Sequence, residues 1–383
     1  MAVSTKWPSG LRSAGVPCGI KASGALDLGL LVAEHPATWA GTFTQNAAAA
    51  SCVDWCRGAL GRPAHALVVN SGNANACTGS AGRMAVEATA AAAAAELGCQ
   101  PDEVLVCSTG PIGVPLDAGL LSASLPEAIA ALSPDTDDFS RSLLTTDTFA
   151  KVSSASAGAA SIVGVAKGAA MLNPNMATML AFIGTDATVE PDMLQTSLTY
   201  AVERSFNRLC IDACESTNDS VIALATGAGP GVDEPELRTA LLKVCGELAL
   251  KMARDAEGGT KLIRVRVEGA RDEAHAVTLG KTIASSNLWS AAAHGADPNW
   301  GRVLSAMGSV DRSLDITSTA VAIGNEVVFA SGEPCGFLAN AAAAMHGDEF
   351  TVTVTLDVGE ATAEVLTSDL SEEYVTLNAE VTT

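Results

Sequence analysis

Residues 167–187 read KGAAMLNPNMATMLAFIGTDA, and a single threonine, Thr178, stands inside their apolar run. The preceding Asn173-Pro174 pair favours a turn, because proline restricts the backbone of the residue before it. Apolar residues after a turn are typical of a buried strand. Thr178 is therefore either an ordinary β-branched strand residue or a nucleophile at the start of the strand.

The composition limits the size and the partners of the protein. The chain has 383 residues, of which 48% are hydrophobic and only 4% aromatic, enough for two or three domains with a core of small side chains. Lysine and arginine number 22 against 43 acidic residues, a formal charge of −21. This charge repels nucleic acid and anionic membrane surfaces, so an anionic substrate requires a local cationic pocket.

Cysteine and histidine usage argues against disulfides and metals. The ten cysteines include two CxxxC pairs, Cys52/Cys56 and Cys210/Cys214, but no CxxC motif, and the five histidines form no ligand-like cluster. We therefore expect free thiols, no metal site and a cytoplasmic location. No stretch has the roughly 18 consecutive apolar residues of a membrane span, and the first residues do not resemble a signal peptide.

Helical and strand patterns alternate along the chain. Residues 233–258 predict a helix with Asp233 as its N-cap and a stripe of Leu237, Leu241, Leu248 and Met252. Residues 261–269 alternate apolar with charged side chains and predict a strand with one wet face. Further helices are expected at 80–98 and 190–206, and further strands at 64–70, 102–110 and 349–359. The fold class is therefore α+β, with sheets covered by helices.

Self-cleavage before Thr178 would turn it into a nucleophile. A threonine hydroxyl needs a base, and cutting the Ala177-Thr178 bond supplies one in the new α-amine, whose ordinary pKa is about 7.7–8. The small Ala177 side chain leaves the hydroxyl room to attack the preceding carbonyl.

Several polar segments offer partners for such a nucleophile. CSTGPIG at 107–113 ends an apolar strand with backbone N–H groups suited to an oxyanion, or is an ordinary turn. Four more segments line a site or form loops and solvated helix ends, namely 70–79 (NSGNANACTG), 143–151 (LLTTDTFAK), 205–220 (SFNRLCIDACESTNDS) and 293–304 (AHGADPNWGRVL).

Together these motifs, and above all KGAAMLNPNMATML, resemble the ornithine acetyltransferase (glutamate N-acetyltransferase) family, from about Gly19 to the last residue. The resemblance implies an αββα sandwich like that of N-terminal-nucleophile hydrolases, differently connected. It also implies cleavage into an α chain (1–177) and a β chain (178–383), assembled as a heterotetramer of two α and two β chains. Family members move an acetyl group from N-acetylornithine to glutamate through an acetylated threonine, without a cofactor, and some also accept acetyl-CoA.

The resemblance also assigns the site residues. Thr178 is the nucleophile, and Thr109 and Gly110 form the oxyanion hole. Lys167 adds a cation for an anionic substrate, and Glu257 is suited to a substrate ammonium. The remaining substrate-binding positions, beside Thr178, are Thr145, Asn378 and Thr383.

The C-terminal tail is expected to be docked, with Leu370, Tyr374 and Val375 packing one face onto the body. Its alternative is a frayed chain end. The sequence departs from the family at 47–52, where the small residues AAAASC stand in place of basic ones. Two other functions remain open, an amide hydrolase of related fold with a serine nucleophile, and an uncleaved binding protein for acetylated amino acids.

Overall fold

The computed structural model describes residues 5–173 and 179–380, and these residues divide into two compact units. Of the described residues, unit 1 contains those up to Asn207 together with Cys214–Met252, and unit 2 contains Arg208–Ala213 and residues 253–380. The predicted cut at Ala177-Thr178 lies outside the described residues. The division into α and β chains therefore stays a prediction. The strands before and after the predicted cut belong to the same sheet of unit 1.

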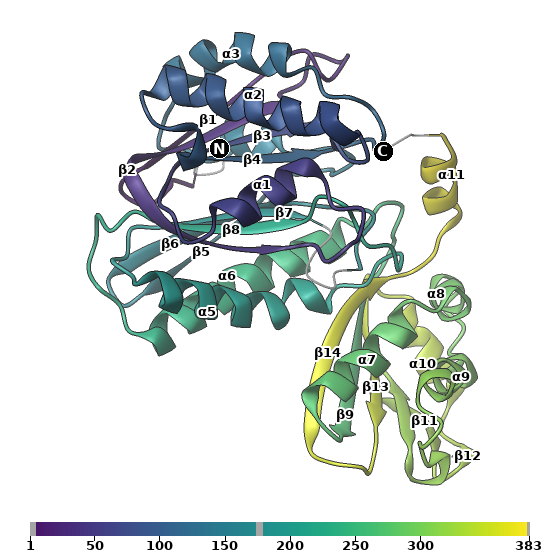
Figure 1. Ribbon diagram of the computed structural model, residues 1–383. Coiled ribbons are helices and arrows are strands. Elements are labelled where there is room, and N and C mark those ends of the chain that lie inside the picture. Colours follow the sequence, from purple (N-terminus) through teal and green to yellow (C-terminus); the bar gives the residue numbers. More distant parts are fainter. Residues whose placement is uncertain (1–4, 174–178, 381–383) are drawn as a thin grey trace. The chain divides into compact units, whose positions relative to one another are not determined.

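One long strand, β2 (Leu28–Phe43), joins the two halves of the sheet in unit 1 (Figure 1). Its first half pairs with β1 and β3, and its second half pairs with β8. The strand order is β4-β3-β2-β8-β7-β6-β5. The other strands are β1 (Leu11–Val16), β3 (Ala64–Ser71), β4 (Val104–Thr109), β5 (Lys151–Ala157), β6 (Ala160–Lys167), β7 (Leu180–Thr185) and β8 (Ser220–Ala225).

Helices cover the two halves of this sheet on their outer sides. In Figure 1, α2 (Gly79–Leu97) and α3 (Ala118–Ala130) lie over the half that contains β3 and β4, and α5 (Pro191–Glu203) and α6 (Glu234–Arg254) lie under the other half. The predicted αββα order of layers is confirmed. Shorter elements complete the unit, namely α1 (Ser51–Ala59), α4 (Asp137–Ser142) and the 3-10 turns Pro101–Glu103 and Phe206–Arg208.

The predicted third helix forms as its sequence indicates. The Asp233 carboxylate accepts a hydrogen bond of 2.9 Å from the Glu236 N–H, which caps the start of α6. The predicted stripe is fully buried, at Leu237, Leu241, Leu248 and Met252. Glycine lets this helix approach the sheet, because a Cβ on Gly164 of β6 would lie 2.7 Å from Val244 Cγ1.

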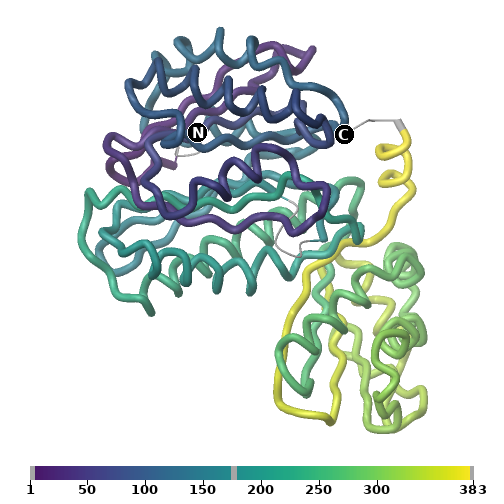
Figure 2. The backbone as a smooth tube through the Cα atoms, in the orientation of Figure 1, coloured from purple at the N-terminus to yellow at the C-terminus, as the bar shows by residue number. Residues whose placement is uncertain are grey.

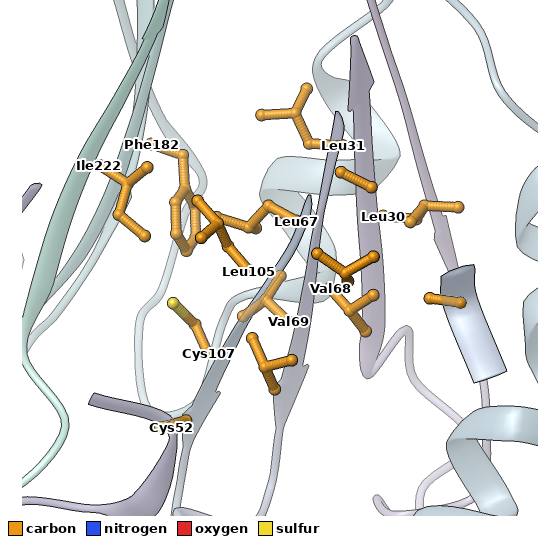
Figure 3. Close-up of a cluster of buried hydrophobic side chains, with 14 of the residues drawn as sticks. Leu30, Leu31, Cys52, Leu67, Val68, Val69, Leu105, Cys107, Phe182 and Ile222 are labelled. Carbon is orange, nitrogen blue, oxygen red and sulfur yellow. The ribbon is translucent and has the colours of Figure 1, made fainter. Parts of the chain in front are cut away.

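The core of unit 1 lies between the two halves of the sheet. Figure 3 shows Leu67 and Leu105 from β3 and β4 facing Phe182 and Ile222 from β7 and β8. All four side chains are fully buried. The core therefore holds strands from both sides of residue 178 together, with the small side chains expected from the composition.

Unit 2 is a second sheet with its own helices. Its strand order is β12-β11-β10-β13-β9-β14, and β13 and β9 run parallel. In β9 (Leu262–Ala270) the predicted alternation is confirmed, since Ile263, Val265 and Val267 are fully buried. The other strands are β10 (Ala320–Ile323), β11 (Glu326–Ala330), β12 (Glu333–Pro334), β13 (Glu349–Thr355) and β14 (Ala361–Ser368).

Five helices and a 3-10 turn accompany this sheet, and the chain leaves it through β14. Figure 2 shows the C-terminal segment running from β14 into a last helix, α11 (Glu372–Glu380). None of the helices in the described part of the chain is long and apolar enough to cross a membrane. The other elements are α7 (Glu273–Ala284), α8 (Asn287–His294), α9 (Trp300–Val310), α10 (Leu338–Met345) and the turn Ile316–Ser318.

Candidate active site

Three of the predicted site residues meet in unit 1. Lys167 is the last residue of β6, and Thr109 is the last residue of β4, in the opposite half of the sheet. The Lys167 ammonium donates to Thr145 Oγ1 at 2.7 Å and to Thr109 Oγ1 at 3.3 Å. Lys167, the cation predicted for an anionic substrate, is therefore buried and contacts two hydroxyl groups.

Sequence reasoning missed the carboxylate that organises this cluster. The Asp147 side chain is fully buried, and its Oδ1 accepts from Lys151 Nζ at 2.7 Å and from the Gly168 N–H at 2.6 Å. Its Oδ2 accepts from the Thr145 N–H at 3.2 Å and lies 3.9 Å from Lys167 Nζ. A solvated helix end, the alternative considered for residues 143–151, is therefore wrong at Asp147 and Lys151.

Cations surround the Asp147 carboxylate. Burial by itself raises the pKa of Asp147, but Lys167, Lys151 and the Gly168 N–H outweigh it and lower the pKa to about 2. The pKa of Lys21 is lowered, chiefly by burial and with a contribution from Lys167, although Asp27 and Asp147 act in the opposite direction. Lys151 and Lys167 beside Asp147 provide the local cations that an acidic protein needs for an anionic substrate.

Gly110 occupies a position that only glycine fits. Its φ is +139°, and a Cβ there would lie 2.4 Å from the Asn73 nitrogen. The Asn73 N–H donates to the Thr109 carbonyl at 3.0 Å, and the Ala74 N–H donates to the Pro111 carbonyl at 3.1 Å. The loop at 70–79 is therefore a tightly built turn that fixes the backbone of Thr109 and Gly110.

Residues 216–219 (STND) support the same loops from the opposite half of the sheet. The Asn218 side-chain amide donates to the Ala74 carbonyl at 2.6 Å and to the Ser108 carbonyl at 2.9 Å. Asn218 is buried and lies at the expected junction between a helix and a strand. Asn218 therefore joins the two loops, 70–79 and 107–113, through hydrogen bonds.

The remaining described site residues, Glu257 and Asn378, meet in unit 2. Glu257 is buried, and its Oε2 accepts from Asn378 Nδ2 at 2.8 Å. The tail is helical here, but its predicted apolar docking is wrong at Val375, whose residue is 59% exposed. Polar groups anchor it instead, since Ser371 Oγ donates to the Gly258 carbonyl.

The predicted nucleophile Thr178, together with Ala177 and the predicted substrate position Thr383, lies outside the described residues. The described chain resumes at Met179, whose carbonyl accepts from the Ser220 N–H at 3.0 Å, and Leu180 pairs with Lys167 in the sheet. Within residues 5–173 and 179–380, no group of three or more histidine, cysteine, aspartate or glutamate residues is arranged to hold a metal ion.

Replacing Asp147 with asparagine should destabilise the protein by about 3–5 kcal/mol at neutral pH, because it leaves buried lysines without their counter-charge. The pKa of Asp147 is lowered from 3.8 to about 2, so its stabilising effect is complete above the ordinary value and is lost as the pH falls toward 2. The difference between wild type and Asp147→Asn in urea unfolding should therefore shrink over that interval.

The exposed Asp102 forms a surface ion pair with Arg62 and provides the control. Asp102→Asn should change the unfolding free energy by less than about 1 kcal/mol. Equal stability of Asp147→Asn and wild type at pH 7 would contradict this account of the buried cluster.

Comparison with known proteins gives the family. The ArgJ family model matches residues 12–383. The arginine biosynthesis bifunctional protein ArgJ of Thermus thermophilus is 42% identical over the whole of both chains, and that of Agrobacterium fabrum is 39% identical over 97% of this chain and 94% of its own. The crystal structure of the Bacillus halodurans protein of that name is 36% identical, with a TM-score of 0.51, and matches 53% of this chain and all of its own. The chain therefore belongs to the ArgJ family, as its motifs predicted.

Proposed function

We propose that this protein is a self-cleaving acetyltransferase of arginine biosynthesis that moves the acetyl group of N2-acetyl-L-ornithine to L-glutamate through an acetylated Thr178. The full-length match to the ArgJ family supports the reaction class. One structural observation supports the site. The Lys167 ammonium binds both Thr109 and Thr145, and Lys167 pairs with Leu180, two residues after Thr178.

Lys167 determines which hydrogen bonds the two hydroxyl groups accept and which they can donate. An ammonium can only donate, so the oxygens of Thr109 and Thr145 accept from Lys167 and their own hydrogens are left to donate elsewhere. The Thr109 O–H and the Gly110 N–H then serve as the two donors of an oxyanion hole, in which developing negative charge lies near a cation. The Asp147 carboxylate lies 3.9 Å from the Lys167 ammonium and balances part of its charge.

Self-cleavage is compatible with the way the strands pair. β6 ends at Lys167 and β7 begins at Leu180, and the two strands are hydrogen-bonded along their length. β7 also pairs with β8 on its other edge. A cut between Ala177 and Thr178 would therefore leave both chains held in one sheet, and the new α-amine of Thr178 would act as the base for its hydroxyl.

Glu257 is suited to recognise the amino-acid part of the substrate. It is buried, and Asn378 donates to its Oε2, so a substrate ammonium would add to a carboxylate that is already oriented. We assign Asn378 and Thr383 to the same substrate, as their positions in the family motif imply.

Two competing functions fit less well. A serine amide hydrolase would need serine where this chain has Thr178, and a binding protein would have no use for an ordered hydroxyl-lysine cluster at the predicted oxyanion hole. The assembly that we propose is cytoplasmic and contains two α and two β chains. Acetyl-CoA is a second possible donor, because both donors would acylate the same threonine.

Thr178→Ala should leave one uncut chain without transferase activity, because both the attacking hydroxyl and the acetyl acceptor are lost. Denaturing mass spectrometry gives the chain masses directly. Thr196→Ala, on an exposed position of α5, should split into two chains as the wild type does. A Thr178→Ala chain that still splits at this bond without added protease would overturn the assignment.

Thr109→Val removes the hydroxyl but keeps the shape of the side chain, and it should lower kcat about 10²-fold. Thr109→Ser keeps the hydroxyl within reach of Lys167 and should retain most of the activity. Steady-state kinetics of acetyl transfer to glutamate measures both variants. A Thr109→Val enzyme with the kcat of wild type would show that the Thr109 hydroxyl does not stabilise the oxyanion.

A further inference from the structure

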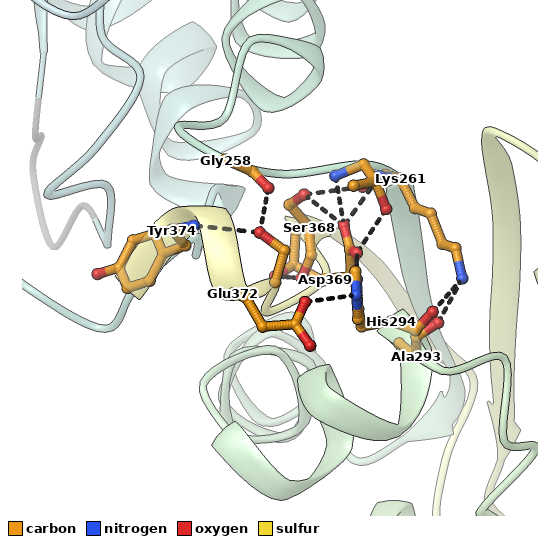
Figure 4. Close-up of polar contacts among 11 residues, drawn as sticks. Gly258, Lys261, Ala293, His294, Ser368, Asp369, Glu372 and Tyr374 are labelled. Carbon is orange, nitrogen blue, oxygen red and sulfur yellow. Dashed lines mark hydrogen bonds and ion pairs between the residues drawn. The ribbon is translucent and has the colours of Figure 1, made fainter. Parts of the chain in front are cut away.

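The proposed role of Glu257 leaves open what holds Asn378 against it. Asn378 belongs to α11, a short helix close to the C-terminus, where chains commonly fray unless they are anchored. The anchor lies at the start of this helix, in a polar cluster drawn in Figure 4.

Asp369 is the centre of this cluster. It is buried and follows β14 directly. Its Oδ1 accepts from the Thr260 and Lys261 N–H groups at 2.7 and 2.9 Å. Its Oδ2 accepts from Thr260 Oγ1 at 2.6 Å and lies 2.7 Å from Nδ1 of His294. Burial raises the pKa of Asp369, but these hydrogen bonds outweigh it and lower the pKa.

His294 is itself held in place by Lys261, the residue before β9. It is the last residue of α8, and Lys261 Nζ donates to the carbonyls of Ala293 and His294 at 2.6 and 2.9 Å. A cation at these carbonyls also complements the negative end of the helix dipole. The Nε2 of His294 lies 3.4 Å from the carboxylate of Glu372, the first residue of α11. The imidazole therefore connects α8 to both Asp369 and the start of the tail helix.

The direction of α11 follows from this starting point. Ser371 Oγ donates to the Gly258 carbonyl and accepts from the Tyr374 N–H at 3.1 Å, as the N-cap of the helix. A Cβ on Gly258 would lie 2.3 Å from the Tyr374 nitrogen, so the first turn lies directly against this backbone. Asn378 comes seven residues after Ser371, about two helical turns later on the same face, and there it contacts Glu257.

We propose that His294 and Asp369 are positioning residues for substrate recognition, because they fix the start of α11 and so hold Asn378 against Glu257. The proposal rests on the proposed function for the identity of the substrate, but the docking of α11 does not. Neither residue touches substrate in this account. They act on the substrate indirectly, because Asn378 orients the carboxylate group of Glu257.

The test compares His294→Ala with His294→Asn. Alanine removes the bond to Asp369, whereas the asparagine amide nitrogen can occupy the place of Nδ1 and restore it. His294→Ala should increase deuterium exchange of the backbone amides in 372–380 and raise KM for acetylornithine and glutamate roughly tenfold, the effect of losing one charge-assisted hydrogen bond. The value of kcat and the self-cleavage should be unchanged, and His294→Asn should return both readouts toward wild type.

His346→Ala, at an exposed histidine after α10, is the control and should behave as wild type in both measurements. Wild-type exchange in 372–380 and wild-type KM in His294→Ala would overturn the proposal. Increased exchange throughout β9–β14 with a fall in kcat would also overturn it, in favour of a general structural role. A wild-type protein that transfers no acetyl group would refute the proposed function, and the exchange experiment would still decide whether His294 docks the tail.

Discussion

The buried carboxylate of Asp147 is the interaction on which the candidate site depends. Removing a charge from water is costly, and this one is retained because Lys151, Lys167 and two backbone N–H groups surround it. The contacts join the loop before β5, the start of β5 and the end of β6. They hold Lys167 where its ammonium reaches Thr145 and Thr109. The result is a Lys167 ammonium group held in one position, inside a protein whose net charge is −21.

The small side chains of the sequence serve the same site. Gly110 has a backbone conformation that only glycine adopts readily, and it lies against the turn at 70–79 too closely for a Cβ. Asn218 then connects this turn to the end of β4. Close approach of backbones replaces bulky packing at this place, so the donors of the proposed oxyanion hole are held by main-chain hydrogen bonds. Such donors need little reorganisation during a reaction.

Much of the fold could be predicted from the sequence because the signals were local. The alternation of Ile263, Val265 and Val267 with charged residues defines β9, and the Asp233 cap with its apolar stripe defines α6. Asp147 and Lys151 could not be identified in this way. Their four-residue spacing is also that of an exposed ion pair, and only the sheet contacts reveal that both are buried. Val375 was misjudged because polar groups, rather than an apolar face, dock the tail.

The candidate site could be predicted only through the family motif. No local rule connects Thr109, Thr145 and Lys167, which come from β4, a loop and β6 and meet through the pairing of distant strands. The residues of unit 2 show the same limit. Glu257 and Asn378 are separated by most of that unit in sequence and are joined by one hydrogen bond. Asp369, Ser371 and His294 make their hydrogen bonds at the start of the helix that carries Asn378.

If Thr178 carries the acetyl group during transfer, the acetylated enzyme can be trapped. The enzyme would be mixed with N-acetylornithine in the absence of glutamate, quenched in acid and analysed by peptide mass spectrometry, with acetyl-CoA offered as donor in a parallel sample. We expect a chain that begins at Thr178 and is heavier by one acetyl group, which is lost when glutamate is added before the quench. An acetyl group on a different residue, or turnover with no acetylated enzyme at any time, would contradict it.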